Sequence, residues 1–357
     1  MTGNHDDHGW SLSGSGAALV SALLFGVTTP LAKQLLTGAN PLLIAGLLYA
    51  GSGLGLTLMI LAQDRGHFTL GLARRDRPWL IAAVASGGVL APALLMFGLA
   101  RADAAAASLL LNLEAVFTAV IAWIFFREAT SRRVVLGFVA IFVGSLVLVW
   151  PTRLTPQQSA VALCAIAAAC LCWALDNNLT RRISGGDARG IAAVKGLAAG
   201  VTNVGLALAF HAALPSTGKL WASLLLGFLG YGMSLVLFIF SLRNLGTART
   251  GAYFATAPFI GSAVAIVLYG QSVGWAFWIA AACMAAGVWL HLTENHEHDH
   301  FHEPVTHTHA HSHDAHHQHE HAAGSEASEP HVHEHRHEPV RHRHPHFPDI
   351  HHQHTHS

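Results

Sequence analysis

Charged residues are scarce in this sequence. Only 11% of the 357 residues are Asp, Glu, Lys or Arg, whereas a soluble domain carries roughly 25%. The shortage is sharper in the body of the chain, because eleven of the twenty acidic residues lie at or beyond Glu294. A body this apolar is not expected to fold in water. We therefore predict an integral membrane protein that contacts the lipid bilayer, and neither an enzyme nor a nucleic-acid-binding protein.

Cysteine is also rare, and the sequence does not predict a disulfide framework because all the cysteines lie in apolar runs. They are Cys164, Cys170, Cys172 and Cys283. The first apolar run is neither preceded by a cationic segment nor followed by a clear cleavage site, so we expect it to remain as a membrane span. The sequence has no phosphate-binding P-loop pattern. It therefore does not support a pump driven by ATP.

Long apolar runs fill most of the chain. A membrane-spanning helix needs about 20 mostly apolar residues, and ten segments qualify, each bounded by charges, proline or polar clusters. They are roughly 14–35, 41–63, 79–99, 104–126, 134–150, 159–179, 190–213, 221–242, 250–270 and 274–292. The predicted fold is an all-α membrane protein with ten transmembrane helices. A short cytoplasmic segment (1–13) precedes them and a polar tail (293–357) follows.

The basic residues predict the orientation, since loops rich in Lys and Arg stay in the cytoplasm. Twelve Lys and Arg residues lie in the loops of one parity, and only four lie in the opposite loops, namely Lys33, Arg101, Arg153 and Lys219. We therefore expect both termini in the cytoplasm and a multi-pass protein of the inner (plasma) membrane. The polar tail is then cytoplasmic.

The two halves of the apolar body resemble each other. A shift of 143 residues aligns LEAVFTAVIAWIFFRE (113–128) with TAPFIGSAVAIVLYGQ (256–271), and Gly144 with Gly287. Each half contains five predicted spans, which is an odd number, so the second half is expected to lie upside down relative to the first. Such inverted repeats are typical of secondary transporters, whose substrate site lies near the bilayer midplane.

The stretch LEAVFTAVIAWIFFREATSRRVVLGFVAIFVGSLVLV (113–149) resembles the EamA repeat of the drug/metabolite transporter superfamily. In that repeat a span led by Glu or Pro ends near an acidic residue, and a glycine-rich span follows. Glu128 matches the acidic residue, whereas Gln271 replaces it in the second half. The resemblance covers about residues 16–292. It implies two EamA-like repeats (14–150 and 151–292) in a ten-helix carrier that moves a small solute without ATP hydrolysis.

Glu114 is the clearest candidate for function, because ionisable residues inside a bilayer are costly and functional by default. It lies about eleven residues into the fourth span, and its repeat counterpart is the neutral Ala257. A charged carboxylate there costs roughly 2.5–3.5 kcal/mol, which a proton, a partner or a cationic substrate must offset. Thr118 is one helical turn away and can share its cavity, whereas Asn112 faces elsewhere. The alternative is a protonated Glu114 satisfied by a neighbouring helix.

A second polar block lies towards the cytoplasmic end of the sixth span. It consists of Asp176, Asn177 and Asn178, within CWALDNNLTRR. Such a block suits the mouth of a transport path. The alternative is an interfacial helix end at which Asp176 pairs with Arg181 or Arg182.

The counterpart of that block is FGVTTP in the first span. Aligning Phe25 with Trp173 places Thr28 and Thr29 near the external face, so the two polar blocks suit the two mouths of an alternating-access path. Two prolines, Pro92 and Pro258, lie within spans near the midplane and are candidate gating points. Close packing of small residues is the alternative explanation for the helix breakers.

Histidine is abundant in the tail, which holds 23 of the 28 histidines after residue 295. Large apolar side chains are almost absent there, so we predict a disordered tail. Neutral imidazole is a suitable ligand for nickel, cobalt, zinc and copper, and the lack of thiol and thioether in the tail argues against a dedicated copper(I) site. The candidate metal ligands are His307, His309, His311, His313, His316, His317, His319, His321, His331, His333, His335 and His337.

The combined interpretation is a secondary transporter that exports a divalent transition metal captured by the tail. Nickel or cobalt is favoured ahead of zinc, Glu114 is the residue for cation or proton coupling, and no cofactor is required. The first alternative is an exporter of a small organic metabolite or amino acid whose tail is regulatory. The second is a membrane metal sensor that transports nothing. A homodimer is compatible with each of them.

Overall fold

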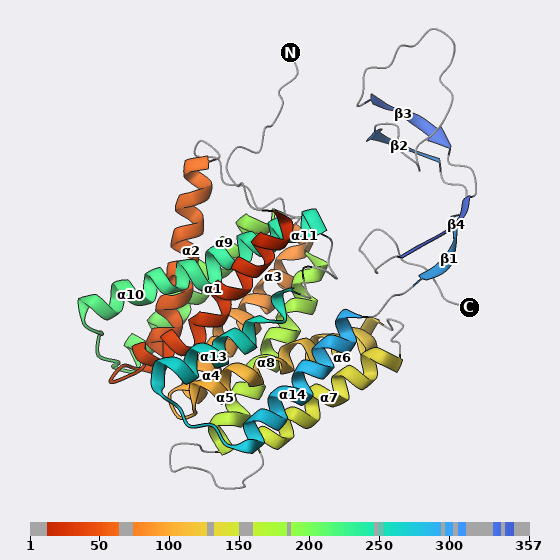
Figure 1. Ribbon diagram of the computed structural model, residues 1–357. Coiled ribbons are helices and arrows are strands. Elements are labelled where there is room, and N and C mark those ends of the chain that lie inside the picture. Colours follow the sequence, from red (N-terminus) through yellow and green to blue (C-terminus); the bar gives the residue numbers. More distant parts are fainter. Residues whose placement is uncertain are drawn as a thin grey trace. The chain divides into compact units, whose positions relative to one another are not determined.

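The computed structural model describes residues 13–63, 74–126, 132–149, 160–183, 187–245, 250, 253–293, 297–302, 306–311, 331–336 and 340–345. The chain divides into two compact units, Met1–Glu294 and Asn295–Ser357, which we describe separately. The first unit is a bundle of helices (Figure 1). The second contains the only strands among the described residues.

The helices follow the apolar runs of the sequence closely. Each of the ten intervals predicted to span the membrane is occupied by helix, with ends that differ by a few residues. The uninterrupted helices are α1 (Gly14–Leu35), α2 (Pro41–Gln63), α7 (Arg132–Val149), α8 (Ala160–Arg182), α9 (Ala188–Ala209) and α14 (Trp275–Leu292).

Four of the predicted spans are not regular along their whole length. Two contain a π-helical turn. In the first, η2 (Val84–Leu90) separates α3 (Arg77–Ala83) from α4 (Ala91–Leu99). In the second, η3 (Phe228–Met233) separates α10 (Thr217–Gly227) from α11 (Ser234–Leu245). A 3-10 turn, η1 (Arg74–Asp76), precedes α3. The other two change direction at a short turn, between α5 (Ala104–Leu110) and α6 (Leu113–Phe126) and before α13 (Ala257–Tyr269). The interruptions fall at matching places in the two halves, because the shift of 143 residues carries η2 onto η3 within one residue.

Among the described residues, seven helical segments are long and apolar enough to cross a membrane. They are Gly14–Leu35, Pro41–Gln63, Arg74–Leu99, Ala104–Ile121, Ala160–Thr180, Arg189–Ala209 and Thr217–Ser241. Three further apolar helices are shorter, Val135–Leu148, Ala257–Tyr269 and Trp275–Leu290. The first unit is therefore a multi-pass membrane protein.

The helices pack in pairs that join the two halves, α2 with α9 and α7 with α14 (Figure 1). Glycine allows the close approach in the second pair. A methyl group on Gly144 would lie 2.9 Å from the carbonyl oxygen of Ala280, and one on Gly287 would lie 2.6 Å from that of Gly137. Under the 143-residue shift Gly144 corresponds to Gly287 and Gly137 to Ala280, so each helix makes toward the other the contact that it receives from it.

Helix α1 lies against α13, and α8 lies against α6, at corresponding places in the two halves. The α1–α13 crossing is closed by backbone: a methyl group on Gly26 would lie 2.5 Å from the carbonyl oxygen of Ala257, and one on Gly261 would lie 2.6 Å from that of Gly26. At the α6–α8 crossing, Glu114 replaces Ala257 and polar side chains fill the contact. One crossing is therefore tight and apolar, and the other is polar.

The described residues of the second unit form four short strands in two antiparallel pairs. Strand β1 (Glu297–His302) pairs with β4 (Val340–Pro345), and β2 (Thr306–His311) pairs with β3 (His331–Arg336). The alternation of His with other residues suits these strands, because a period of two fits an extended strand.

Candidate functional site

The break between α5 and α6 places Glu114 in the first turn of a new helix inside a predicted span. Leu111 and Asn112 form the turn, and the amide of Glu114 donates to the carbonyl of Leu111 over 3.1 Å. The amino end of a helix carries free N–H groups and a positive dipole, both of which favour a carboxylate. The sequence predicted a continuous helix here and so missed this source of stabilisation.

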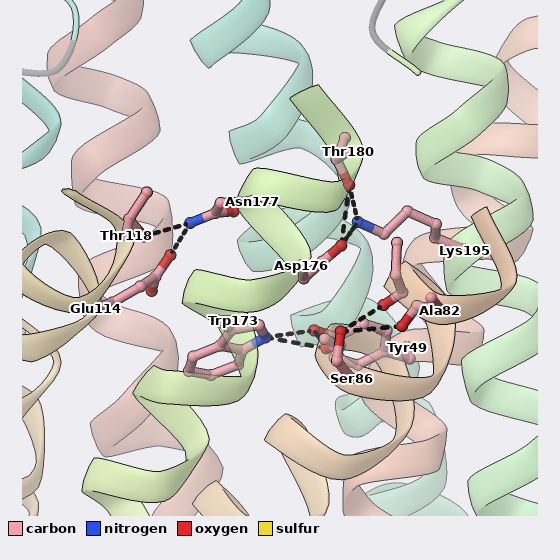
Figure 2. Close-up of polar contacts among 12 residues, drawn as sticks. Tyr49, Ala82, Ser86, Glu114, Thr118, Trp173, Asp176, Asn177, Thr180 and Lys195 are labelled. Carbon is pink, nitrogen blue, oxygen red and sulfur yellow. Dashed lines mark hydrogen bonds and ion pairs between the residues drawn. The ribbon is translucent and has the colours of Figure 1, made fainter. Parts of the chain in front are cut away.

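Asn177 of α8 connects Glu114 to Thr118. Its Nδ2 donates to Oε1 of Glu114 over 2.9 Å and to Oγ1 of Thr118 over 3.3 Å (Figure 2). Asn177 is exposed and Glu114 is half-buried. The structure thus brings together three of the residues predicted from the sequence, and Asn177, the described side-chain partner of Glu114, is uncharged.

The neighbouring Asn178 has a structural position. It is buried, and its Nδ2 donates to the carbonyl oxygens of Thr118 (3.1 Å) and of Ala174 (2.8 Å). Asn178 therefore holds α8 against α6, which fixes the distance between Asn177 and Glu114. Asn112 lies apart from this group, since its amide donates to the carbonyl of Leu109.

Asp176 faces the other side of α8 and forms an ion pair. Lys195 Nζ of α9 lies 2.5 Å from Asp176 Oδ1, and Thr180 Oγ1 donates to the same oxygen over 2.9 Å. The two charged side chains are only 10% and 17% exposed, in the order Asp176 and Lys195. Figure 2 shows the two polar groups on opposite sides of α8. The side chains of Arg181 and Arg182, the partners considered from the sequence, lie outside the described residues.

The ion pair rests against the π-helical turn η2. A methyl group on Gly87 would overlap the Asp176 carboxylate. The carbonyl of Gly87 accepts hydrogen bonds from Tyr49 Oη of α2 (3.0 Å) and from Trp173 Nε1 (3.0 Å) (Figure 2). A π-helical turn displaces backbone groups from the regular ladder, and here two side chains satisfy the displaced carbonyl. Helices α2, α8, α9 and η2 thus meet around Asp176.

The remaining predicted residues lie elsewhere. Thr28 and Thr29 are buried in α1, where the hydroxyl of Thr28 donates to the carbonyl of Leu24 and lies against Gly230 of η3. The contact between Thr28 and Gly230 corresponds to the contact between Asp176 and Gly87 in the other half. Thr28 thus occupies the matching position but carries no charge.

The two prolines that were predicted to gate lie next to irregular turns. Pro258 is in the first turn of α13, where its missing N–H would have no helical partner. Pro92 follows η2 directly in a continuous helical segment, so it removes an N–H beside the π-helical turn. Both are buried and both adjoin an interruption of a span, so they remain candidate gating residues.

Lys195 was missed by the sequence reasoning, although it lies in the apolar run GIAAVKGLAAG. A lone lysine in a predicted span is a signal in itself, by the same argument that singled out Glu114. It was overlooked because only loop lysines were weighed for orientation. Tyr49 and Trp173 carry weaker signals, since aromatic residues in spans are common.

The described residues contain no group of three or more His, Cys, Asp or Glu side chains placed to hold a metal ion. Of the histidines predicted as ligands, His307, His309 and His311 lie on β2, and His331, His333 and His335 lie on β3. The others are His313, His316, His317, His319, His321 and His337, which lie outside the described residues.

Ionisable side chains within a helical membrane body, such as Glu114, Asp176 and Lys195, are typical of membrane transport proteins. Residues 12–150 and 160–293 match the EamA-like transporter family, and the chain belongs to this family. It is therefore a membrane transporter, and family members are not enzymes. Gln271, at the position where the EamA repeat carries an acid, accepts a hydrogen bond from the amide of Ala105 over 3.2 Å. Glu128 lies outside the described residues.

Two single proteins are also similar to this chain. An uncharacterized transporter of Methanothermobacter thermautotrophicus is 25% identical over 290 residues, which cover 76% of this chain and 84% of the relative. A crystal structure described only as that of a protein is similar in fold, with a TM-score of 0.58 and 19% identity, over 77% of this chain and 94% of the other.

Proposed function

We propose that this transporter is a secondary carrier that exports a divalent transition metal, nickel or cobalt ahead of zinc. The observation that supports a cationic substrate is the set of contacts around Glu114. This carboxylate accepts a hydrogen bond from Asn177, which is neutral and also donates to the neutral Thr118. A carboxylate with neutral partners gains most from a cation or a proton. The exchange of one for the other couples export to the proton gradient.

Ten spans in two inverted repeats are part of this proposal. Three observations support it: helices occupy all ten predicted intervals, the π-helical turns η2 and η3 match under the repeat, and the α7–α14 contact is reciprocal. Discontinuous spans around a site between two inverted repeats are a common arrangement in secondary transporters.

The proposed orientation places both termini in the cytoplasm of the inner (plasma) membrane. It rests on the excess of Lys and Arg in the loops of one parity. We expect a reporter enzyme that functions only in the cytoplasm to be active when fused after Ser357. Activity of an external reporter at that position would overturn the orientation, and the argument for export with it.

The tail is proposed to capture cytosolic metal and deliver it to the carrier. Its alternating histidines supply interchangeable imidazole donors, and adjacent Glu and Asp residues lower the electrostatic cost of gathering a divalent cation. The carrier body and the tail then have separate tasks, which deletion of the tail distinguishes.

We expect full-length protein in liposomes to move radiolabelled Ni²⁺, and a variant that lacks residues 296–357 to show a lower affinity at an unchanged maximal flux. The effect of the tail will fade below about pH 5.5, since imidazoles with an ordinary pKa near 6.5 are then protonated and do not ligate. Flux against Ni²⁺ concentration, at pH 7.5 and 5.5, measures both effects. Co²⁺ and Zn²⁺ in the same assay establish the order of preference.

Export of a small organic amine or amino acid is the second candidate. The side chains beside Glu114 are an amide and a hydroxyl, whose oxygens can accept from an ammonium group as well as ligate a metal, and the described residues hold no three-ligand metal group. Flux of labelled amino acids without flux of Ni²⁺ would establish this candidate. Binding of Ni²⁺ by the tail without any flux would leave a membrane sensor.

A further inference from the structure

Asp176 has a cationic partner within the protein, whereas no described cation pairs with Glu114. Lys195 Nζ lies 2.5 Å from Asp176 Oδ1 and 3.1 Å from Thr180 Oγ1, so the ammonium is held by two side chains of α8. Asp176 and Asn177 are adjacent in sequence, and Asn177 contacts Glu114. The two carboxylates of the site therefore lie on opposite sides of α8, Asp176 on α8 itself and Glu114 on α6, and Asp176 is already neutralised.

The ion pair joins α8 to α9, and these two helices pack mainly against different neighbours. Helix α8 packs against α4 and α6, while α9 packs against α2. Both donors to Asp176 use Oδ1, and the carboxylate lies directly against Gly87 of η2. Lys195 reaches Asp176 from α9 through a flexible four-carbon chain, so the ammonium can withdraw without a shift of the backbone.

An empty carrier must return across the membrane without its substrate. A lone carboxylate in a low-dielectric interior is strongly unfavourable, and removal of one partner of a buried ion pair leaves such a charge. A lysine that fills the carboxylate in the empty state removes this obstacle. An incoming cation can then replace the ammonium beside the carboxylate, so the carboxylate stays neutralised throughout.

We propose that Asp176 is a second cation site and that Lys195 is its tethered occupant while the carrier is empty. A substrate cation displaces the Lys195 ammonium from Asp176, and Lys195 returns to Asp176 after release. Lys195 is thus a positioning residue that permits the return of the empty carrier. The part of this inference that concerns flux rests on the proposed export of a divalent metal.

The first test does not depend on any substrate. Lys195→Ala removes the ammonium and leaves space for a small amine beside Asp176. We expect 100 mM n-propylammonium to raise the unfolding temperature of this variant in detergent by about 2–4 °C relative to tetramethylammonium, which cannot donate a hydrogen bond. The same salts should not distinguish wild type, or the double variant Lys195→Ala, Asp176→Asn. An equal response of all three proteins would overturn the cation site.

The second test separates the return of the empty carrier from movement with substrate. Lys195→Met keeps the length of the side chain and removes its charge. In liposomes we expect exchange of internal for external Ni²⁺ within about twofold of wild type, and net Ni²⁺ efflux at least about tenfold slower. Lys195→Arg should keep both. If Lys195→Met loses exchange and efflux equally, and the double variant Lys195→Met, Asp176→Asn regains both, the ion pair is purely structural and the proposal is overturned.

The two failures are distinguishable. If wild-type protein moves no Ni²⁺, the proposed metal export is overturned, and the propylammonium measurement alone decides whether Asp176 accepts an external cation. If Lys195→Ala does not fold, Lys195→Met in the same thermal assay replaces it. We then expect Ni²⁺ to raise the unfolding temperature more in Lys195→Met than in wild type, and an equal rise would overturn the proposal.

Discussion

Replacement of Glu114 with glutamine will abolish coupled transport while the protein remains folded and inserted. Glutamine keeps the shape of the side chain and can still contact Asn177, but it cannot exchange a proton for a cation. The break before α6 is set by the backbone and should persist. We expect net flux in liposomes to fall at least about a hundredfold, which corresponds to a barrier raised by about 2.7 kcal/mol.

A matched control is Asp76→Asn, which also removes a carboxylate. Asp76 precedes α3 at its amino end, outside the polar site, and its described ion pair with Arg75 is long at 4.0 Å. We expect near-normal flux from this variant. If Glu114→Gln transports at the wild-type rate with the wild-type pH dependence, Glu114 is a packing residue and the proposed coupling fails.

Replacement of Gly87 with alanine will inactivate the carrier by a steric clash, without changing any charge. The added methyl group would overlap the carboxylate of Asp176, while Trp173 and Tyr49 hold the carbonyl of the same residue. Either the carboxylate leaves Lys195 or the π-helical turn opens. Overpacking of this kind costs about 1–3 kcal/mol, which predicts a lower unfolding temperature and a flux reduced by about tenfold or more.

Gly205→Ala in α9 is the control, because a methyl group there would meet nothing within 4 Å. Glycine in a regular helix is about 1 kcal/mol less favourable than alanine, so the control should be neutral or slightly stabilised. If Gly87→Ala has the unfolding temperature and flux of wild type, then η2 can move to accommodate a methyl group, and the close contact between Gly87 and Asp176 is not needed for transport.

The helices were predictable because a bilayer leaves a chain few choices. Apolar runs of about 20 residues, bounded by charges, coincide with helices in the structure, and a lone acid such as Glu114 stands out against them. The polar block at Asp176, Asn177 and Asn178 was visible for the same reason. Periodicity also placed Thr118 on the same face as Glu114, where the structure has it.

The partners of these residues were not predictable, since they depend on which helices cross. Asn177 reaches Glu114 and Lys195 reaches Asp176 only because α8 lies between α6 and α9, and spacing along the chain does not encode that arrangement. The π-helical turns were hidden as well. Glycine pairs in apolar runs occur in many regular helices, so Gly87 and Gly88 carried no distinct signal until Asp176 was seen beside them.

The unequal crossings of α1 with α13 and of α6 with α8 have a consequence for a carrier built from two related halves. In the proposed alternating mechanism the two crossings exchange roles, yet one is sealed by backbone at Gly26 and Gly261 and the other is lined with polar side chains. The two end states are therefore not mirror images in free energy. Solute gradients set the direction of net transport. The difference between the two crossings sets which of the two end states, inward-open or outward-open, the carrier favours when no substrate is bound.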